Sequence, residues 1–291
     1  MNEGSGFVSS VINEDGTLLK VFNNNIILVN SKEQEKILFE KGIGFGKKPG
    51  HIIQKGTIVE KVFIVEDENN RKNLSNVIEK TDSEFFGICE EAILEVSKRF
   101  KGELNENIHI GLIDHLYYAV KRIKKNEIVK NPFLIEIQTL YREEYMLAEI
   151  IVDKIYEKLN VKMPDDETGF VALHIHSAIN NVGLSNTIRN SYLVSKIVEC
   201  IEKELSIKLD KISLDYARFL THIKFALQRI VEKRDSTNVL KEMIKEGYKE
   251  SYAISKEIAV IIEHELKTEV SEDEITFLAI HIERFRLSLK A

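Results

Sequence analysis

The stretch His115-Leu-Tyr-Tyr-Ala-Val-Lys-Arg-Ile123 recurs 107 residues later as His222-Ile-Lys-Phe-Ala-Leu-Gln-Arg-Ile230. A second block shows the same offset, because Asp166-Glu167 and His174 are matched by Asp273-Glu274 and His281. No gap is needed over the 59 residues that separate the two histidines of each copy. Chance does not readily produce such a match. The sequence therefore predicts two copies of one domain, each carrying a histidine pair.

The hydrophobic pattern changes along the chain and predicts a multidomain protein. From about residue 76 onward, apolar residues recur at spacings of three and four, which is typical of helices. We expect two all-α helical-bundle repeats, at residues 76–180 and 181–291, joined where asparagine, glycine and serine cluster. Residues 66–75 are very polar and are predicted to form a linker. Residues 1–17 are expected to be a flexible or weakly ordered extension.

Residues 18–65 are predicted to form a small antiparallel β-sheet domain. Leu18-Leu-Lys-Val-Phe22 and Ile26-Ile-Leu-Val29 flank three asparagines, which suit a tight turn because asparagine tolerates positive φ. Two further β-prone runs are Ile37-Leu-Phe39 and residues 59–65. Between them lies the glycine-rich stretch Lys41-Gly-Ile-Gly-Phe-Gly-Lys-Lys48.

Charge is unevenly distributed. The whole chain has a formal net charge of −6, but residues 18–64 contain eight lysines and four glutamates and are therefore positive. A small basic module on an acidic body is consistent with a nucleic-acid-binding head attached to a separate regulatory part.

Composition points to a cytoplasmic protein. Hydrophobic residues make up 43% and charged residues 30% of the chain, as in soluble globular proteins. No apolar run is long enough for a membrane-spanning helix, and no secretory signal is recognisable at the N-terminus. The two cysteines, Cys89 and Cys200, form neither a disulfide framework nor a zinc motif.

Histidine can bind a metal, act in acid–base catalysis or accept a phosphoryl group. The alternative is a buried histidine with satisfied hydrogen bonds, and His174 and His281 share helical faces with apolar residues. No metal-hydrolase motif such as His-Glu-x-x-His is present, so a metal-dependent hydrolase is disfavoured and no cofactor is expected. The remaining histidines, at positions 51, 109, 176 and 264, are interpreted as surface or core residues.

Several motifs resemble a known family. The segments Lys20-Val-Phe-Asn-Asn-Asn25, Lys41–Lys48 and Lys61-Val-Phe63 resemble the co-antiterminator RNA-binding domain of the BglG/SacY/LicT transcriptional antiterminators. The paired segments around the four histidines resemble the two phosphotransferase-system (PTS) regulation domains of that family. The glycine-rich stretch and Ala172-Leu-His-Ile-His-Ser-Ala178 are most similar to the branch that controls glucose-permease genes.

The resemblance implies a homodimer that grips an RNA hairpin, prevents formation of an overlapping terminator and is not an enzyme. Asparagine side chains can pair with base edges, an aromatic ring can stack on a base, and lysines can contact phosphates. Phe45 is also compatible with a role in the core. The family often has glycine where this chain has Glu40, which leaves the RNA contact at that corner open. The expected RNA-binding residues are Lys20, Asn23, Asn25, Lys41, Gly42, Phe45, Lys47 and Lys48.

The same resemblance implies phosphorylation of His115, His174, His222 and His281 by PTS proteins. A sugar-specific permease component would modify the first repeat, and the general phosphocarrier protein would act on the second. Thr221 stands where Asp114 precedes the first histidine, so the two repeats need not behave alike. A DNA-binding activator built on the same regulation domains is the alternative, but it would require a helix-turn-helix or ATPase segment.

Overall fold

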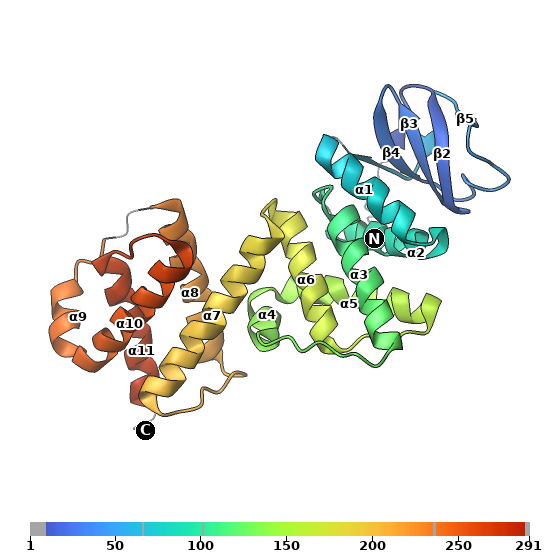
Figure 1. The fold of residues 1–291 in the computed structure, drawn as a ribbon. Coiled ribbons are helices and arrows are strands. Elements are labelled where there is room, and N and C mark those ends of the chain that lie inside the picture. The colour runs from blue at the N-terminus through green and yellow to red at the C-terminus, as the bar shows by residue number, and fades with distance from the viewer. Residues whose placement is uncertain (1–9, 66, 101, 235–236, 289–291) are drawn as a thin grey trace, which may run out of the picture. The chain divides into compact units, whose positions relative to one another are not determined.

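The computed structural model describes residues 10–65, 67–100, 102–234 and 237–288 (Figure 1). The chain forms two compact units, each described here by itself. The first comprises Met1–Lys130 and Glu143–Val182, and the second Asn131–Arg142 and Gly183–Ala291. A sheet domain followed by a mostly helical region confirms the predicted fold class.

The first unit begins with a five-stranded antiparallel sheet, drawn in blue in Figure 1. Its strand order is β5-β2-β3-β4-β7. The strands are β2 (Gly16–Asn23), β3 (Ile26–Ser31), β4 (Gln34–Phe39), β5 (Ile52–Ile53) and β7 (Lys61–Val65). The predicted turn at the asparagines joins β2 to β3, where Asn23 pairs with Ile26.

Apolar residues of these strands form the core of the sheet domain. Leu18, Ile27, Val29 and Leu38 are each at most 2% exposed and pack in one cluster. In β2 the buried Leu18 lies between the exposed Thr17 and Leu19, so a one-residue slip would expose it. In β3, by contrast, Ile26–Val29 are all buried.

Part of the predicted N-terminal extension is ordered. Residues 1–9 lie outside the described part of the chain, but Ser10–Val11 forms β1, which pairs with β6 (Ile58–Val59). Ile12 is 7% exposed within the sheet core, and β2 already begins at Gly16. The prediction of a flexible extension is therefore wrong for residues 10–17, because Ile12 anchors them in the core.

The predicted linker at residues 66–75 is mostly helical. Helix α1 (Glu68–Lys80) begins after Asp67, whose carboxylate accepts a hydrogen bond from the Asn70 N–H at 2.9 Å. This N-cap and the burial of Leu74, Val77 and Ile78 stabilise a helix that its polar start obscures in the sequence.

Four further helices complete the first unit: α2 (Ser83–Phe100), α3 (Ile108–Lys124), α5 (Arg142–Leu159) and α6 (Asp165–Asn180). Helix α2 packs against β2 and α3, and α3 packs against α1 and α6. The first helical repeat is thus in direct contact with the sheet domain through α2.

The second unit is helical. Its helices are α4 (Leu134–Leu140), α7 (Leu184–Leu205), α8 (Leu214–Glu232), α9 (Lys241–Gly247), α10 (Lys249–Leu266) and α11 (Glu272–Ser288). The largest buried side chains of its core include Tyr216 and Phe219 of α8. Within the described residues, no helix is sufficiently long and apolar to cross a bilayer.

Helix α4 belongs to the second unit, although the 107-residue offset makes it the counterpart of α9. It packs against α7 and α8. The carboxylate of Glu136, only 1% exposed, accepts hydrogen bonds from the Tyr216 hydroxyl at 2.7 Å and the Lys211 ammonium at 2.9 Å. A segment of the first sequence repeat is thereby built into the second unit.

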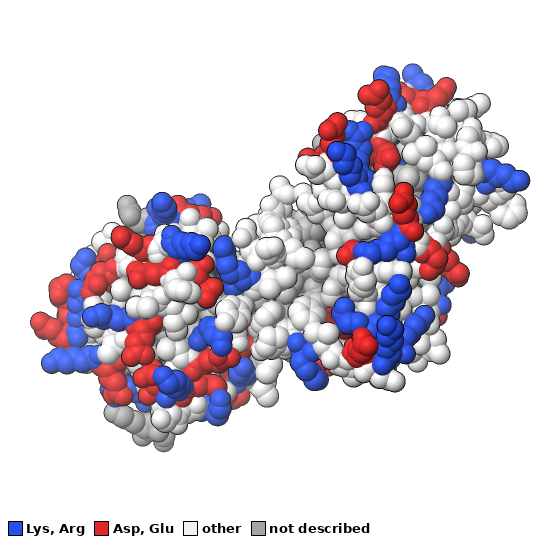
Figure 2. Space-filling model, in the orientation of Figure 1, with Lys and Arg blue, Asp and Glu red and all other residues white. Residues whose placement is uncertain are grey.

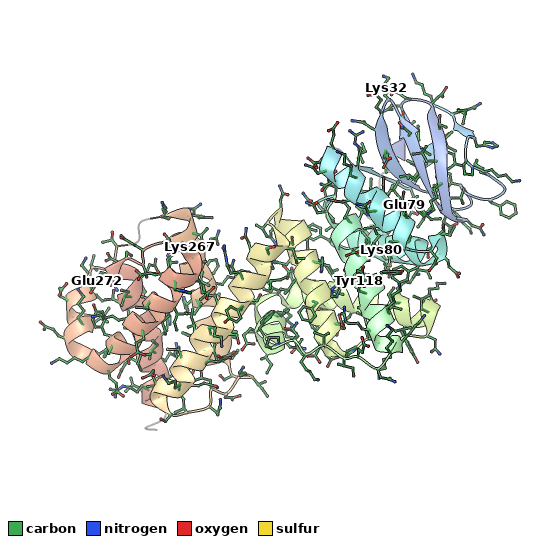
Figure 3. The ribbon with its side chains drawn as sticks, in the orientation of Figure 1. Lys32, Glu79, Lys80, Tyr118, Lys267 and Glu272 are labelled. Atoms are coloured by element: carbon green, nitrogen blue, oxygen red, sulfur yellow. The ribbon has the colours of Figure 1, made fainter. Side chains whose placement is uncertain are left out.

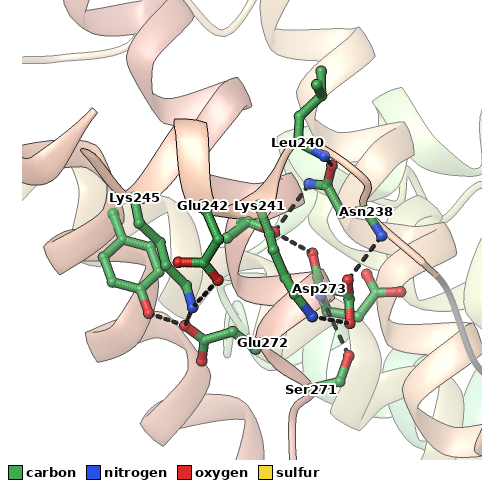
Figure 4. Close-up of polar contacts among 11 residues, drawn as sticks. Asn238, Leu240, Lys241, Glu242, Lys245, Ser271, Glu272 and Asp273 are labelled. Carbon is green, nitrogen blue, oxygen red and sulfur yellow. Dashed lines mark hydrogen bonds and ion pairs between the residues drawn. The ribbon is translucent and has the colours of Figure 1, made fainter. Parts of the chain in front are cut away.

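Helix α9 is held to its own repeat by polar contacts with the start of α11 (Figure 4). The Asn238 N–H donates to Asp273 at 2.8 Å, and Lys245 forms an ion pair with Glu272 at 2.7 Å. The Ser271 hydroxyl accepts a hydrogen bond from the Glu274 N–H at 3.3 Å, as expected of an N-cap.

Candidate functional site

The asparagine turn and the glycine-rich loop, which are separated by β3 and β4 in the sequence, lie against each other. The N–H of Gly44 donates to the Asn24 carbonyl at 2.9 Å, and the N–H of Gly42 donates to the Asn25 side chain at 3.1 Å. A Cβ on Gly44 would lie 2.3 Å from the Asn23 carbonyl oxygen, so only glycine permits this approach. The structure therefore brings two of the predicted RNA-binding segments together.

Phe45 projects from this loop with 75% of its surface exposed, so the alternative role in the core is excluded. Lys41 and Lys48 are also exposed, whereas the Lys47 ammonium donates to the Ile43 carbonyl at 2.7 Å. An exposed ring beside cationic side chains can stack on an unpaired base while the cations meet phosphates.

Lys20 and Asn23, also predicted to contact RNA, face the first helical repeat. The Lys20 ammonium donates to the Ile78 carbonyl at 3.1 Å. The Asn23 side-chain amide donates to Glu91 of α2 at 2.9 Å. These two side chains already have protein partners, so RNA could reach them only by displacing those contacts.

An aromatic stack strengthens this contact between β2 and α2. The rings of Phe22 and Phe86 are 4.2 Å apart with an interplanar angle of 25°. A Cβ on Gly87 would lie 2.7 Å from the Asn23 amide nitrogen, so the glycine lets α2 approach the strand. The contact thus combines buried apolar surface with a charge-assisted hydrogen bond.

The two histidines of the first repeat lie beside each other. The rings of His115 on α3 and His174 on α6 have centroids 5.1 Å apart. Burial, and secondarily the charge of His115, lowers the pKa of His174 to about 3. His174 is therefore neutral near pH 7 and has an unprotonated ring nitrogen that can act as a nucleophile.

The second repeat reproduces this arrangement with a closer pair. The rings of His222 on α8 and His281 on α11 are stacked, with centroids 4.0 Å apart. Burial, followed by the charges of His222 and Arg284, lowers the pKa of His281 to about 4. A cavity of about 340 Å³ is lined by both histidines, Arg229 and three apolar residues.

The residues preceding the first histidine of each pair differ, as the sequence indicates. Asp114 forms an ion pair with Lys80 of α1 at 2.7 Å, and the Lys80 ammonium lies 4.4 Å from the Tyr118 ring (Figure 3). This contact raises the pKa of Lys80 to about 12. Thr221 instead donates its hydroxyl to the Ala217 carbonyl at 2.8 Å. Only the first repeat therefore has a carboxylate at this position.

The other histidines have separate surroundings. His109 is buried with its Nδ1 2.8 Å from Glu90, and His176 Nδ1 lies 2.7 Å from Glu144. The His264 side chain is 85% exposed. Among the residues that the structure describes, no group of three or more histidine, cysteine or carboxylate side chains is placed to hold a metal.

A glutamate–arginine pair lies beside each histidine pair and was not predicted from the sequence. Glu167 accepts from Arg122 at 2.8 Å, and Glu274 accepts from Arg229 at 2.6 and 2.7 Å. All four residues lie inside the duplicated blocks, each seven positions from a histidine. Seven residues are nearly two helical turns, so a shared face was predictable.

Comparisons with known proteins agree with this architecture. A family model described as CAT RNA binding domain matches residues 17–72, and the PRD domain model matches residues 90–178 and 195–285. Protein GlcT of Staphylococcus saprophyticus is 32% identical over 273 residues, which cover 93% of this chain and 97% of the relative. Protein GlcT of Staphylococcus haemolyticus is 33% identical, over 92% and 95% of the two chains.

A solved structure is similar to the N-terminal part. The crystal structure of GlcT CAT-PRDI shares 43% identity with this chain at a TM-score of 0.50, and the match covers 57% of this chain and 99% of that one.

Proposed function

Since the chain belongs to the GlcT-type family of CAT–PRD antiterminators and is an RNA-binding regulator under PTS control, we propose the following mode of action. It binds a hairpin in the leader RNA of a sugar-PTS gene and thereby prevents an overlapping terminator from forming. The observation that carries this proposal is the exposed Phe45 on a glycine-rich loop that packs against the asparagine turn. Exposed lysines beside it supply phosphate contacts.

The RNA surface of this proposal contains Asn25, Lys41, Gly42, Phe45 and Lys48. Lys20 and Asn23 can contact RNA once their hydrogen bonds to α1 and α2 break. Lys47 can do so once its ammonium no longer donates to the Ile43 carbonyl. Glu40, whose N–H donates to the Asn25 carbonyl at 3.0 Å, stands at the start of the same loop. Its negative charge disfavours a phosphate at that corner.

Regulation in this proposal acts through phosphorylation of the four paired histidines. The donors are a sugar-specific permease component for His115 and His174, and the general phosphocarrier protein for His222 and His281. Neutral His174 and His281 support the proposal because an unprotonated nitrogen is required to accept the group. The protein works as a homodimer in the cytoplasm.

A DNA-binding activator is not favoured. Residues 10–65 consist of strands and turns in the described structure and contain no helix-turn-helix that could enter a major groove. The features beside the glycine loop suit single-stranded or looped RNA, whose bases are free to stack.

The test is a titration of the hairpin-terminator leader of a neighbouring sugar-permease gene with unmodified protein and with the His115→Asp, His174→Asp double variant. Tight, salt-sensitive binding that the variant loses supports both RNA recognition and inhibition through the first repeat. Equal binding by both proteins would contradict the assigned inhibitory sites. No binding by a correctly folded dimer would contradict RNA recognition itself.

A further inference from the structure

Each histidine pair has an arginine and a buried glutamate on the same two helices. In the first repeat, Arg122 lies seven residues after His115 on α3, and Glu167 lies seven before His174 on α6. The second repeat places Arg229 and Glu274 identically on α8 and α11. Because seven residues correspond to almost two turns, each arginine lies on the face of its helix that carries the histidine.

The carboxylates are buried but the guanidiniums are not. The side chains of Glu167 and Glu274 are 1% and 3% exposed, whereas those of Arg122 and Arg229 are 29% and 34% exposed. A guanidinium has five N–H donors, so the donors directed away from the glutamate are available for a second anion. Arg229 lines the same cavity of about 340 Å³ as both histidines of its repeat.

We propose that Arg122 and Arg229 are positioning residues for the phosphoryl group, and that Glu167 and Glu274 hold them until that group arrives. This inference rests on the proposed histidine phosphorylation. When a histidine of the repeat is modified, the guanidinium exchanges the carboxylate for phosphoryl oxygens, which carry up to two negative charges and accept a fork of hydrogen bonds. The buried carboxylate then loses its cation, and the repeat relaxes its packing around it.

In the transfer itself, the lone pair of an unprotonated imidazole nitrogen forms a bond to phosphorus. The bond from phosphorus to the donor nitrogen or sulfur breaks, and its electron pair leaves with the donor. The nitrogen of His281 is available for this step because its pKa is lowered to about 4. Arg229 contacts the transferred oxygens and takes no proton.

The buried glutamate of each repeat contacts the arginine of the same repeat. Glu274 directs both oxygens at Arg229, whereas Glu167 lies 2.8 Å from Arg122 and 3.0 Å from His115 Nε2. Burial would raise the pKa of Glu167, but the contacts with His115 and Arg122 outweigh it and lower that pKa below its usual value. Glu167 therefore contacts both the arginine and a histidine ring nitrogen of the first repeat.

Labelling of the full-length protein with phosphoramidate tests this inference, because this small donor transfers phosphoryl to histidine nitrogen as ammonia leaves. The initial rate at each histidine is followed by mass spectrometry under alkaline conditions. Arg229→Gln is expected to slow labelling of the second repeat about tenfold to hundredfold, since one charge-assisted hydrogen bond to the anion is lost. Glu274→Gln is expected to accelerate it, since the guanidinium is no longer held by a charge.

Opposite changes in the labelling rate are decisive, because loss of an ion pair with only a structural role would change the rate in the same direction in Arg229→Gln and Glu274→Gln. The matched control is Arg286→Gln, which removes a partner of Glu283 on α11 and leaves the labelling rate unchanged. If Arg229→Gln unfolds the second unit, the double variant Arg229→Gln, Glu274→Gln removes the buried charge as well and should still label slowly. Normal labelling of that folded double variant would overturn the inference.

The outcomes separate the two levels of the proposal. Labelling by phosphoramidate with the expected signs, but none by purified PTS proteins, would contradict the proposed regulation and leave the arginine assignment standing. If both donors label the protein but the rate changes in the same direction in Arg229→Gln and Glu274→Gln, only the arginine assignment is contradicted. An unlabelled wild-type protein would overturn both.

Discussion

Replacing Glu91 with alanine is expected to increase the affinity of the protein for its leader RNA. In the free protein the Asn23 amide donates to Glu91 at 2.9 Å, so RNA that pairs with Asn23 must first break this bond. A hydrogen bond to a charged group contributes about 1.5–3 kcal/mol. Since a 1.4 kcal/mol change is tenfold, removal of the competitor raises affinity by about tenfold to hundredfold.

Fluorescence-anisotropy titration of the labelled hairpin measures this change. Glu91→Ala also removes a negative charge near the RNA, so Glu91→Gln serves as the control that loses the charge and keeps an acceptor. Glu95→Ala is the second control, because Glu95 lies one turn further along α2 and pairs with exposed Arg99.

Two features of the titration separate competition from electrostatics. Relief of competition persists at high salt, whereas a pure charge effect is screened. We expect Glu91→Ala to bind the hairpin more tightly than Glu91→Gln at every salt concentration. Glu95→Ala should bind it with nearly the wild-type affinity. An affinity that is unchanged or lower in a folded Glu91→Ala protein would refute the competition between α2 and RNA.

Three further predictions concern the RNA loop and the two units. Phe45→Ala should weaken hairpin binding by about 1–3 kcal/mol through loss of base stacking, with no change in thermal unfolding because the ring is exposed. Tyr216→Phe should lower the free energy of unfolding in urea by about 1.5–3 kcal/mol, since the hydroxyl donates to buried Glu136. The free energy of unfolding should fall as the pH drops from 6.5 toward 3, because His174 is protonated at a higher pH in the unfolded state than in the folded state. At pH 5 the decrease attributable to His174 is at most about 2 kcal/mol. Urea unfolding of His174→Gln should not show this decrease.

Periodicity made most of the architecture predictable from the sequence. The constant 107-residue offset identified two helical repeats, and short β-prone apolar runs located β2 and β3 on either side of the asparagines. Burial accounts for both signals, because it leaves three- and four-residue apolar spacing in helices and short apolar runs in buried strands. Helix α1 has a polar first half, and its buried residues come only in its last two turns, so its start had no such pattern.

The site was predictable only in part, because sequence identifies functional groups but not their partners. Duplication identified the four paired histidines, and the structure places the two rings of each pair close together. The engagement of Asn23 by Glu91 joins residues 68 positions apart with no repeat to mark the pair. Arg122 and Glu167 were marked by duplication, but a repeated ion pair is equally consistent with a purely structural role.

Electrostatics on the surface explains why net charge alone did not locate the RNA site. On the face drawn in Figure 2, lysines and arginines are interspersed with acids over the second unit. Such alternation is typical of a solvated helical surface. The proposed RNA site is distinguished instead by the local combination of Phe45, glycines and lysines in one loop.

The different positions of α4 and α9 show how two copies of one sequence diverge in structure. Lys245 links α9 to Glu272 of its own repeat, while the equivalent position in α4 is Gln138. Conversely, α4 has Glu136, buried against Tyr216, where α9 has the exposed Met243. A carboxylate that is 1% exposed requires its donors, so α4 cannot leave the second unit without a large loss of stability. Because α5 begins at Arg142, directly after α4, the chain passes from the second unit into the first at this point.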